Sequence, residues 1–90
     1  PAIIDLYADW CGPCRKVAPI MKELAKEYAG KITIYKVNVD KEQELAALFN
    51  ATSIPLFVLI PLKEQPQLMR GAADKATYKK AIDEFLLKTP

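Results

Sequence analysis

The sequence predicts one α/β domain over residues 1–90, built as a mixed four-stranded sheet with helices on both faces. Strand-like apolar runs alternate with segments of helical apolar spacing, in the order β-α-β-α-β-β-α. The strand–helix–strand opening predicts two parallel strands joined by a right-handed crossover. A short turn joins the last two strand segments, which predicts an antiparallel hairpin in the same sheet.

Composition fits this fold class and excludes several functions. Hydrophobic residues make up 51% of the 90 residues, which is typical of a globular domain with a modest core. The 13 basic and 11 acidic residues are interspersed, so no basic stripe indicates nucleic-acid binding. The longest apolar run, 54–62, contains two prolines and is too short to insert into a membrane. With no histidine and two cysteines, one chain cannot supply the four ligands of a zinc site, so no metal is expected.

The first strand, residues 2–7, is predicted to be covered on both faces, because Ile3, Ile4 and Leu6 form an aliphatic run. Asp5 interrupts this run. A carboxylate among buried aliphatic side chains is costly unless it is paired or protonated. Asp5 therefore either reaches solvent at the strand end or is a buried acid held near the cysteines, and we favour the second interpretation.

The segment Trp10-Cys11-Gly12-Pro13-Cys14 contains both cysteines of the chain. It lies where the first strand ends and a helix begins, and the unpaired N–H groups and dipole of a helix N-terminus stabilise negative charge. The reactive form of cysteine is the thiolate, so this position favours a lowered thiol pKa. Two cysteines three residues apart supply an attacking thiolate and a resolving neighbour, the two parts of thiol–disulfide exchange.

A helix is predicted from about residue 13 to residue 28. Pro13 suits its first position, Pro19 should kink it, and Gly30 should end it. The apolar residues at helical spacing are Val17, Ile20, Met21, Leu24 and Tyr28.

Residues 32–39 are rich in β-branched side chains and predict a second strand. Lys36 is one of its polar positions, and two interpretations stay open. It is either a solvated residue on the strand or a partner for Asp5.

A short second helix is predicted to begin near Asp40, with Gln43 completing a capping pair. Its buried face should contain Leu45, Leu48 and Phe49. Asn50 is a suitable residue for its end.

The rest of the chain predicts a hairpin and a last helix. The apolar run 56–60 predicts an interior strand, a polar turn at 63–65 follows, and the half-polar segment 67–70 predicts an edge strand. Asp74 is a good N-cap for the last helix. The predicted buried face of that helix consists of Tyr78, Ala81, Ile82, Phe85 and Leu86.

Together these features resemble the thioredoxin family along nearly all of the chain. The motif Trp10–Cys14 matches the family's active site without substitution. The other matches are a buried aspartate (Asp5) with its lysine neighbour (Lys36), a helix-kinking proline (Pro19), the step Ile54-Pro55 where the family has a cis-proline, and a groove glycine (Gly71).

The resemblance implies a protein-disulfide reductase with no cofactor other than its own disulfide. Cys11, partly exposed, would attack the substrate disulfide, and Cys14, more buried, would resolve the mixed disulfide. Asp5 would accept the proton of Cys14, and Lys36 would moderate the raised pKa of Asp5. The substrate-binding residues implied are Trp10, Gly12, Pro13, Ile54, Pro55 and Gly71.

Departures from the family pattern concern the chain's beginning and the substrate groove. The family's first strand and helix have no counterpart here, so the outer edge of strand 32–39 should be exposed and open to pairing with another chain. A monomer is expected, with a dimer through this edge as the alternative. Leu56 replaces the usual threonine after the cis-proline, and Arg70 replaces an apolar groove residue.

The expected partners are disulfide-containing protein substrates and an electron donor, either a flavin-dependent thioredoxin reductase or a membrane thiol carrier. A cytoplasmic location is the default, with a periplasmic or exported one as the alternative, because Pro1 begins a strand directly and suggests a trimmed start.

Two other functions stay open. The first is an exported disulfide oxidase or isomerase, although such relatives usually carry a histidine between the cysteines. The uncharged Gly12-Pro13 pair favours a reducing potential. The second is a non-catalytic binding subunit, in which Leu56 and Arg70 would shape the partner surface.

Overall fold

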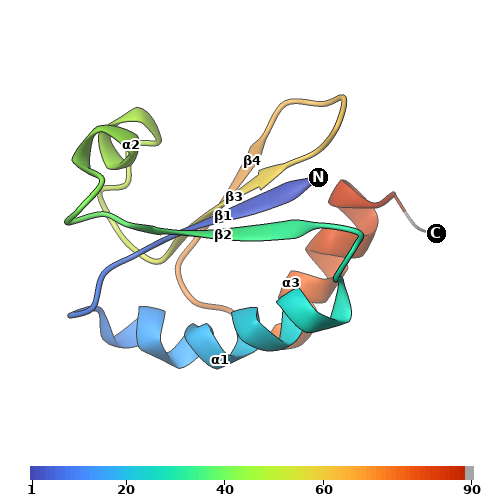
Figure 1. The fold of residues 1–90 in the computed structure, drawn as a ribbon, viewed down its shortest axis with the longest axis horizontal. Helices are drawn as coiled ribbons and strands as arrows, with labels where there is room; N and C mark the ends of the chain where they lie inside the picture. Colours follow the sequence, from blue (N-terminus) through green and yellow to red (C-terminus); the bar gives the residue numbers. More distant parts are fainter. Residues whose placement is uncertain (89–90) are drawn as a thin grey trace.

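The computed structural model describes residues 1–88 and confirms the predicted order of elements. The strands are β1 (Ala2–Tyr7), β2 (Thr33–Asn38), β3 (Leu56–Ile60) and β4 (Gln67–Arg70), and the helices are α1 (Gly12–Glu27), α2 (Gln43–Leu48), α3 (Lys75–Ala81) and the π-helical turn η1 (Ile82–Leu86). The strands form one four-stranded sheet in the order β2-β1-β3-β4 (Figure 1). β1 pairs with β2 in parallel, while β3 and β4 add antiparallel strands, so the predicted mixed sheet is confirmed.

One face of the sheet carries the main core, and α1 and α3 lie together on it (Figure 1). Ile3 from β1 and Phe57 and Leu59 from β3 point to this side. The ring of Phe57 meets that of Tyr78 edge-on, with the centroids 5.0 Å apart. The helical residues of this core include Val17, Met21, Leu24, Tyr28, Tyr78, Ile82 and Leu86, which confirms the predicted apolar faces of both long helical segments.

The opposite face has a smaller core and only partial cover. Leu6, Leu56 and Val58 are buried there. Phe49 and Ala51, from the segment that follows α2, pack against them. Farther along this face, Tyr35 on β2 is 56% exposed and Leu68 on β4 is 46% exposed. Within residues 1–88, β2 lies at one edge of the sheet, so the expected edge position of this strand is confirmed.

The predicted buried face of α2 is wrong. Leu45 is 38% exposed and Leu48 is 73% exposed, and only Phe49, just past the last helical residue, packs on the sheet. The helix begins at Gln43, and the Asp40 side chain does not cap it. The physical reason is position, because α2 has only six residues and lies at the end of the sheet where β2 stops (Figure 1). A helix placed there touches the core with its last turn alone.

Other predicted boundaries agree with the structure within a residue or two. α1 covers Gly12–Glu27 with Pro19 inside it, and the bend expected at Pro19 stays a prediction. Asn50 adopts a left-handed conformation with φ of 52° after α2, which an asparagine tolerates better than most residues. The Asp74 carboxylate accepts the Thr77 N–H at 2.9 Å, so the predicted N-cap of α3 is confirmed.

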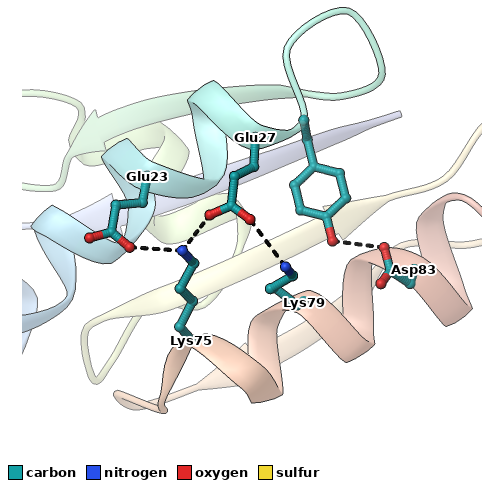
Figure 2. A network of polar contacts seen from close by, with 6 residues as sticks. Glu23, Glu27, Lys75, Lys79 and Asp83 are labelled. Atoms are coloured by element: carbon teal, nitrogen blue, oxygen red, sulfur yellow. Dashed lines mark hydrogen bonds and ion pairs between the residues drawn. The ribbon is translucent and has the colours of Figure 1, made fainter.

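Charged side chains join α1 to α3 on the surface of the main core (Figure 2). The Lys75 ammonium contacts both Glu23, at 2.9 Å, and Glu27. Lys79 contacts the other oxygen of Glu27 at 3.1 Å. One turn farther on, the Tyr28 hydroxyl donates to the Asp83 carboxylate at 2.7 Å (Figure 2).

Candidate active site

The site begins where β1 ends and α1 starts. Cys11 is the N-cap of α1, with extended backbone angles (φ −84°, ψ 110°), and its Sγ accepts a hydrogen bond from the Cys14 N–H at 3.2 Å. The N-terminal N–H groups of a helix have no acceptors within the helix, so an N-cap side chain can accept a hydrogen bond from one of them. A negative charge on the Cys11 sulfur would be stabilised by the same N–H and by the helix dipole.

A disulfide joins Cys11 and Cys14, whose Cα atoms lie 5.2 Å apart. The structure corrects one expectation, because Cys11 is as buried as Cys14, with exposed fractions of 4% and 5%. Both sulfurs pack in a small cluster with Ala8, and Ile54 covers this cluster. The Ile54 carbonyl oxygen lies 3.8 Å from the Cys11 Sγ. Exposure in this disulfide form therefore does not distinguish the two cysteines, whereas their places in the helix do.

Asp5 is the buried acid that the sequence favoured. It is 3% exposed, and it lines a pocket of about 200 Å³ together with Cys14 and Lys36. Among the described residues, its Oδ1 has no hydrogen-bond partner. Burial without a partner disfavours the charged form, so it raises the pKa of Asp5 from 3.8 to about 6, and the positive charge of Lys36 moderates the rise.

Lys36 combines the two interpretations that the sequence left open. It is exposed on the edge strand β2, but it stands directly opposite Asp5 in the parallel register and faces the same pocket. Its Nζ lies 4.6 Å from the centroid of the Tyr7 ring. Lys36 therefore affects Asp5 through its charge at the pocket, while its ammonium group rests on an aromatic ring.

Trp10 projects from the site with 69% of its surface exposed, and its Nε1–H donates to Asp40 Oδ2 at 2.9 Å. The sequence prediction assigned Asp40 to a helix cap and missed this contact. One signal in the sequence could have indicated this contact. The strands β1 and β2 are parallel, so they end at the same edge of the sheet, and the cysteines follow β1 while Asp40 follows β2. A polar residue after either strand is a candidate for this site.

The loop before β3 forms the other wall. The Ile54–Pro55 peptide bond is cis, Pro55 is buried, and the Pro55 carbonyl accepts the Gly71 N–H at 2.9 Å. Gly71 has φ of 84°, a left-handed conformation that favours glycine. Because Ile54 also contacts the cysteine cluster, these residues lie beside the disulfide, and the exposed Gly12 and Pro13 form the first turn of α1 next to them.

Leu56 and Arg70 stand opposite each other in the β3–β4 register, but only Arg70 reaches solvent. Leu56 is fully buried in the smaller core. The prediction that Leu56 shapes a partner surface is therefore wrong, because its side chain lies in the smaller core and does not reach the surface.

The described residues contain no group of three or more acidic, cysteine or histidine side chains arranged to hold a metal ion. None of the helices in residues 1–88 has the length and apolar character needed to cross a bilayer.

The fold and site define a dithiol protein with a strand–helix disulfide beside a cis-proline. A family model described as Thioredoxin matches residues 1–84. The M-type chloroplastic thioredoxin of Spinacia oleracea is 41% identical over 86 residues, which cover 96% of this chain and 48% of that protein. The thioredoxin of Borreliella burgdorferi is 39% identical over 85 residues, covering 94% of this chain and 73% of the relative.

Solved structures agree. The germline-specific thioredoxin Deadhead of Drosophila melanogaster superposes with a TM-score of 0.84 at 31% identity, covering 93% of this chain and 79% of that chain. Mitochondrial thioredoxin 3 of Saccharomyces cerevisiae gives 0.83 at 30% identity, covering 93% and 77%. The chain belongs to the thioredoxin family, and its cysteine pair is placed for dithiol–disulfide exchange. It spans about half the length of the chloroplastic relatives that it matches.

Proposed function

We propose that this chain reduces protein disulfides by dithiol exchange through Cys11 and Cys14. The observation that carries the proposal is the position of Cys11 at the N-cap of α1, where its Sγ accepts the Cys14 N–H at 3.2 Å. A thiolate formed at this sulfur gains the hydrogen bond and the dipole of the helix, which lowers its pKa and makes it the attacking group.

The reaction balances in two exchange steps. The Cys11 thiolate attacks one sulfur of the substrate disulfide, forms a mixed disulfide and releases the first substrate thiolate. The Cys14 thiolate then attacks the Cys11 sulfur, closes the Cys11–Cys14 disulfide and releases the second substrate thiolate. Two electrons have passed to the substrate, and the product is the disulfide form seen in this structure.

Asp5 is proposed to take the proton of Cys14 before the second step. Asp5 and Cys14 line the same pocket, and the pKa of Asp5 near 6 suits a group that exchanges protons close to neutral pH. Lys36 moderates that pKa from the open side of the pocket.

Substrate binding is assigned to the surface around the disulfide. Trp10 offers an exposed aromatic face, and the backbone next to cis-Pro55 offers an extended segment that a substrate strand can pair with. The full set proposed is Trp10, Gly12, Pro13, Ile54, Pro55 and Gly71.

The proposed partners follow from the reaction. Protein disulfides are the substrates, and the disulfide is recharged by a flavin-dependent thioredoxin reductase or a membrane thiol carrier, which makes the chain an electron carrier in redox homeostasis. We propose a cytoplasmic monomer, with an exported location and a dimer through the β2 edge as the alternatives.

Serine variants test the roles of the cysteines. With dithiothreitol as electron donor and a model protein disulfide as substrate, Cys11→Ser should lose all activity. Cys14→Ser should form a mixed disulfide that persists and can be isolated. Glu84→Gln, an exposed change on η1, should retain wild-type activity. Turnover by the double serine variant would overturn the proposal and favour a role that does not use the thiols.

The reduction potential separates a reductase from an oxidase or isomerase. Thioredoxin is itself the reference case at about −270 mV, and protein disulfide isomerase lies at about −180 mV. Equilibration of the Cys11–Cys14 pair against a defined thiol buffer should give a value near the first. A value near the second would contradict the reductase and support the exported oxidant.

The role of Asp5 is tested by Asp5→Asn. Loss of a positioned proton acceptor should slow resolution of the mixed disulfide about tenfold or more at neutral pH. Formation of the mixed disulfide by Cys11 should change much less. An unchanged resolution rate would remove Asp5 from the mechanism and leave the cysteine roles intact.

A further inference from the structure

Tyr7 lines the same pocket as Asp5, although sequence analysis assigned Tyr7 no role beyond ending a strand. It is the last residue of β1 and stands two positions after Asp5, so both side chains point to the face that α1 covers. The half-buried Tyr7 lines the pocket of about 200 Å³ that Asp5, Cys14 and Lys36 also line.

The Tyr7 ring contacts the Lys36 ammonium, with Nζ 4.6 Å from the ring centroid. A cation over an aromatic face is attracted by the ring quadrupole. Lys36 is exposed on an edge strand, and a free lysine side chain loses rotamer entropy when it is fixed in one place. Without the ring, solvent would be the favoured place for this ammonium.

We propose that Tyr7 is a positioning residue for dithiol exchange, because its ring holds the Lys36 ammonium at the mouth of the pocket that Asp5 and Cys14 share. The inference deepens the proposed function and rests on it, since the step affected is proton transfer from Cys14 to Asp5. In that step the Cys14 S–H bond breaks, the proton moves to an Asp5 oxygen, and a Cys14 thiolate remains to attack Cys11. The ammonium stabilises the Asp5 carboxylate before the transfer.

Other groups also face Asp5 and set the background for this effect. Burial raises the pKa of Tyr78 on α3, and the negative charge of Asp5 contributes to that rise, so the two groups interact. The titratable and charged groups around the pocket are Lys36 from β2, Cys14 and Arg15 from α1, Asp9 from the segment after β1, Tyr7 itself and Tyr78 from α3.

A purely structural role for Tyr7 is the competing explanation, since Tyr7 also packs on the cluster of Ala8, Cys11 and Cys14. The two explanations predict opposite signs. A smaller side chain that merely opens the pocket would hydrate Asp5 and lower its pKa. Release of Lys36 from the ring would remove a stabilising positive charge and raise that pKa.

The test follows the Asp5 carboxyl carbon by NMR titration in the oxidised protein, where Cys11 and Cys14 do not titrate. Tyr7→Leu should move the Asp5 midpoint upward by a few tenths of a pH unit, the size expected from an exposed cation–π contact. Tyr7→Phe keeps the ring and should stay near wild type. Tyr35→Leu is the matched control, because it removes an exposed tyrosine from the opposite face of the same sheet. In a Lys36→Met background, Tyr7→Leu should have no further effect.

Four outcomes would overturn the proposal. They are an unmoved midpoint in Tyr7→Leu, a downward shift, a shift that persists in the Lys36→Met background, and an equal shift in Tyr7→Phe. The pH profile of mixed-disulfide resolution in the reduced protein should move with the titration, and a profile that stays in place would overturn the role in exchange. Failure of the proposed function itself is distinguishable, because the wild type would then lack reductase activity while the oxidised titration could still be read.

Discussion

Asp5 lies near the first turn of α1, whereas Glu27 is the last residue of that helix. The surroundings of these two carboxylates shift their pKa values in opposite directions. Asp5 is 3% exposed, one of its oxygens has no hydrogen-bond partner among the described residues, and burial raises its pKa to about 6. Glu27 is on the surface, and hydrogen bonds from Lys75 and Lys79 lower its pKa (Figure 2).

The difference shows which carboxylate contributes to the fold and which one works against it. Glu27 loses little hydration and gains two lysine partners that link α1 to α3. Asp5 loses its hydration, its Oδ1 has no hydrogen-bond partner among the described residues, and the charge of Lys36 offsets only part of the loss, so its ionised form destabilises the folded state. The proposed role of Asp5, as proton acceptor for Cys14, would offset this cost through function rather than through stability.

The largest effect is expected for Asp5→Asn on stability. A displacement of one pH unit corresponds to about 1.4 kcal/mol, so a pKa moved from 3.8 to about 6 corresponds to about 3 kcal/mol at pH 8. The neutral variant should therefore unfold at higher denaturant than wild type when both are oxidised. Glu44→Gln, an exposed carboxylate on α2, should leave the midpoint in place. Equal midpoints for Asp5→Asn and wild type would contradict the buried charge.

The same penalty should appear as a pH dependence of the wild-type free energy of unfolding. The folded protein binds the Asp5 proton more tightly than the unfolded chain does, so the Asp5 contribution is most favourable below pH 3.8. It should decline as pH rises and level off above about pH 6. Subtracting the stability profile of Asp5→Asn from that of wild type isolates this decline. A difference that is flat between those two pH values would show that the carboxylate is hydrated.

A smaller effect is expected at the α1–η1 contact. Tyr28→Phe removes the 2.7 Å hydrogen bond from the buried Tyr28 hydroxyl to the Asp83 carboxylate. The free energy of unfolding should fall by about 1 kcal/mol. Tyr35→Phe is the matched control, since its ring is 56% exposed. Denaturant unfolding of the two variants measures the difference, and equal stabilities would show that the Tyr28 hydroxyl contributes nothing.

The smallest effect is expected for Glu27→Gln. Its pairs with Lys75 and Lys79 are solvated and screened by salt, so the loss of stability should be slight at low ionic strength and absent in 1 M salt. The wild-type contribution should be present above the unfolded pKa and disappear as pH falls through the lowered folded pKa. A loss as large as that of Tyr28→Phe would show that the surface network is stronger than its exposure indicates.

Local patterns accounted for most of the fold. Period and capping residues placed α1, β3 and the Asp74 cap, because these depend on neighbours a few residues away. They failed for Leu45 and Leu48, whose spacing is helical but whose helix lies past the end of the sheet. Burial there depends on whether another element covers the face, and residue spacing carries no information about that.

The candidate site divides in the same way. The sequence alone determined that two cysteines open a helix after a buried strand and that an acid lies in that strand, because these follow from order along the chain and alternation within it. Only the tertiary structure decided that Cys11 is as buried as Cys14. It also decided that Trp10 donates a hydrogen bond to Asp40 and that the Lys36 ammonium lies over the Tyr7 ring. Each of these joins residues from different elements, and the register between β1 and β2 and the packing of the loop at Ile54 fix their distances.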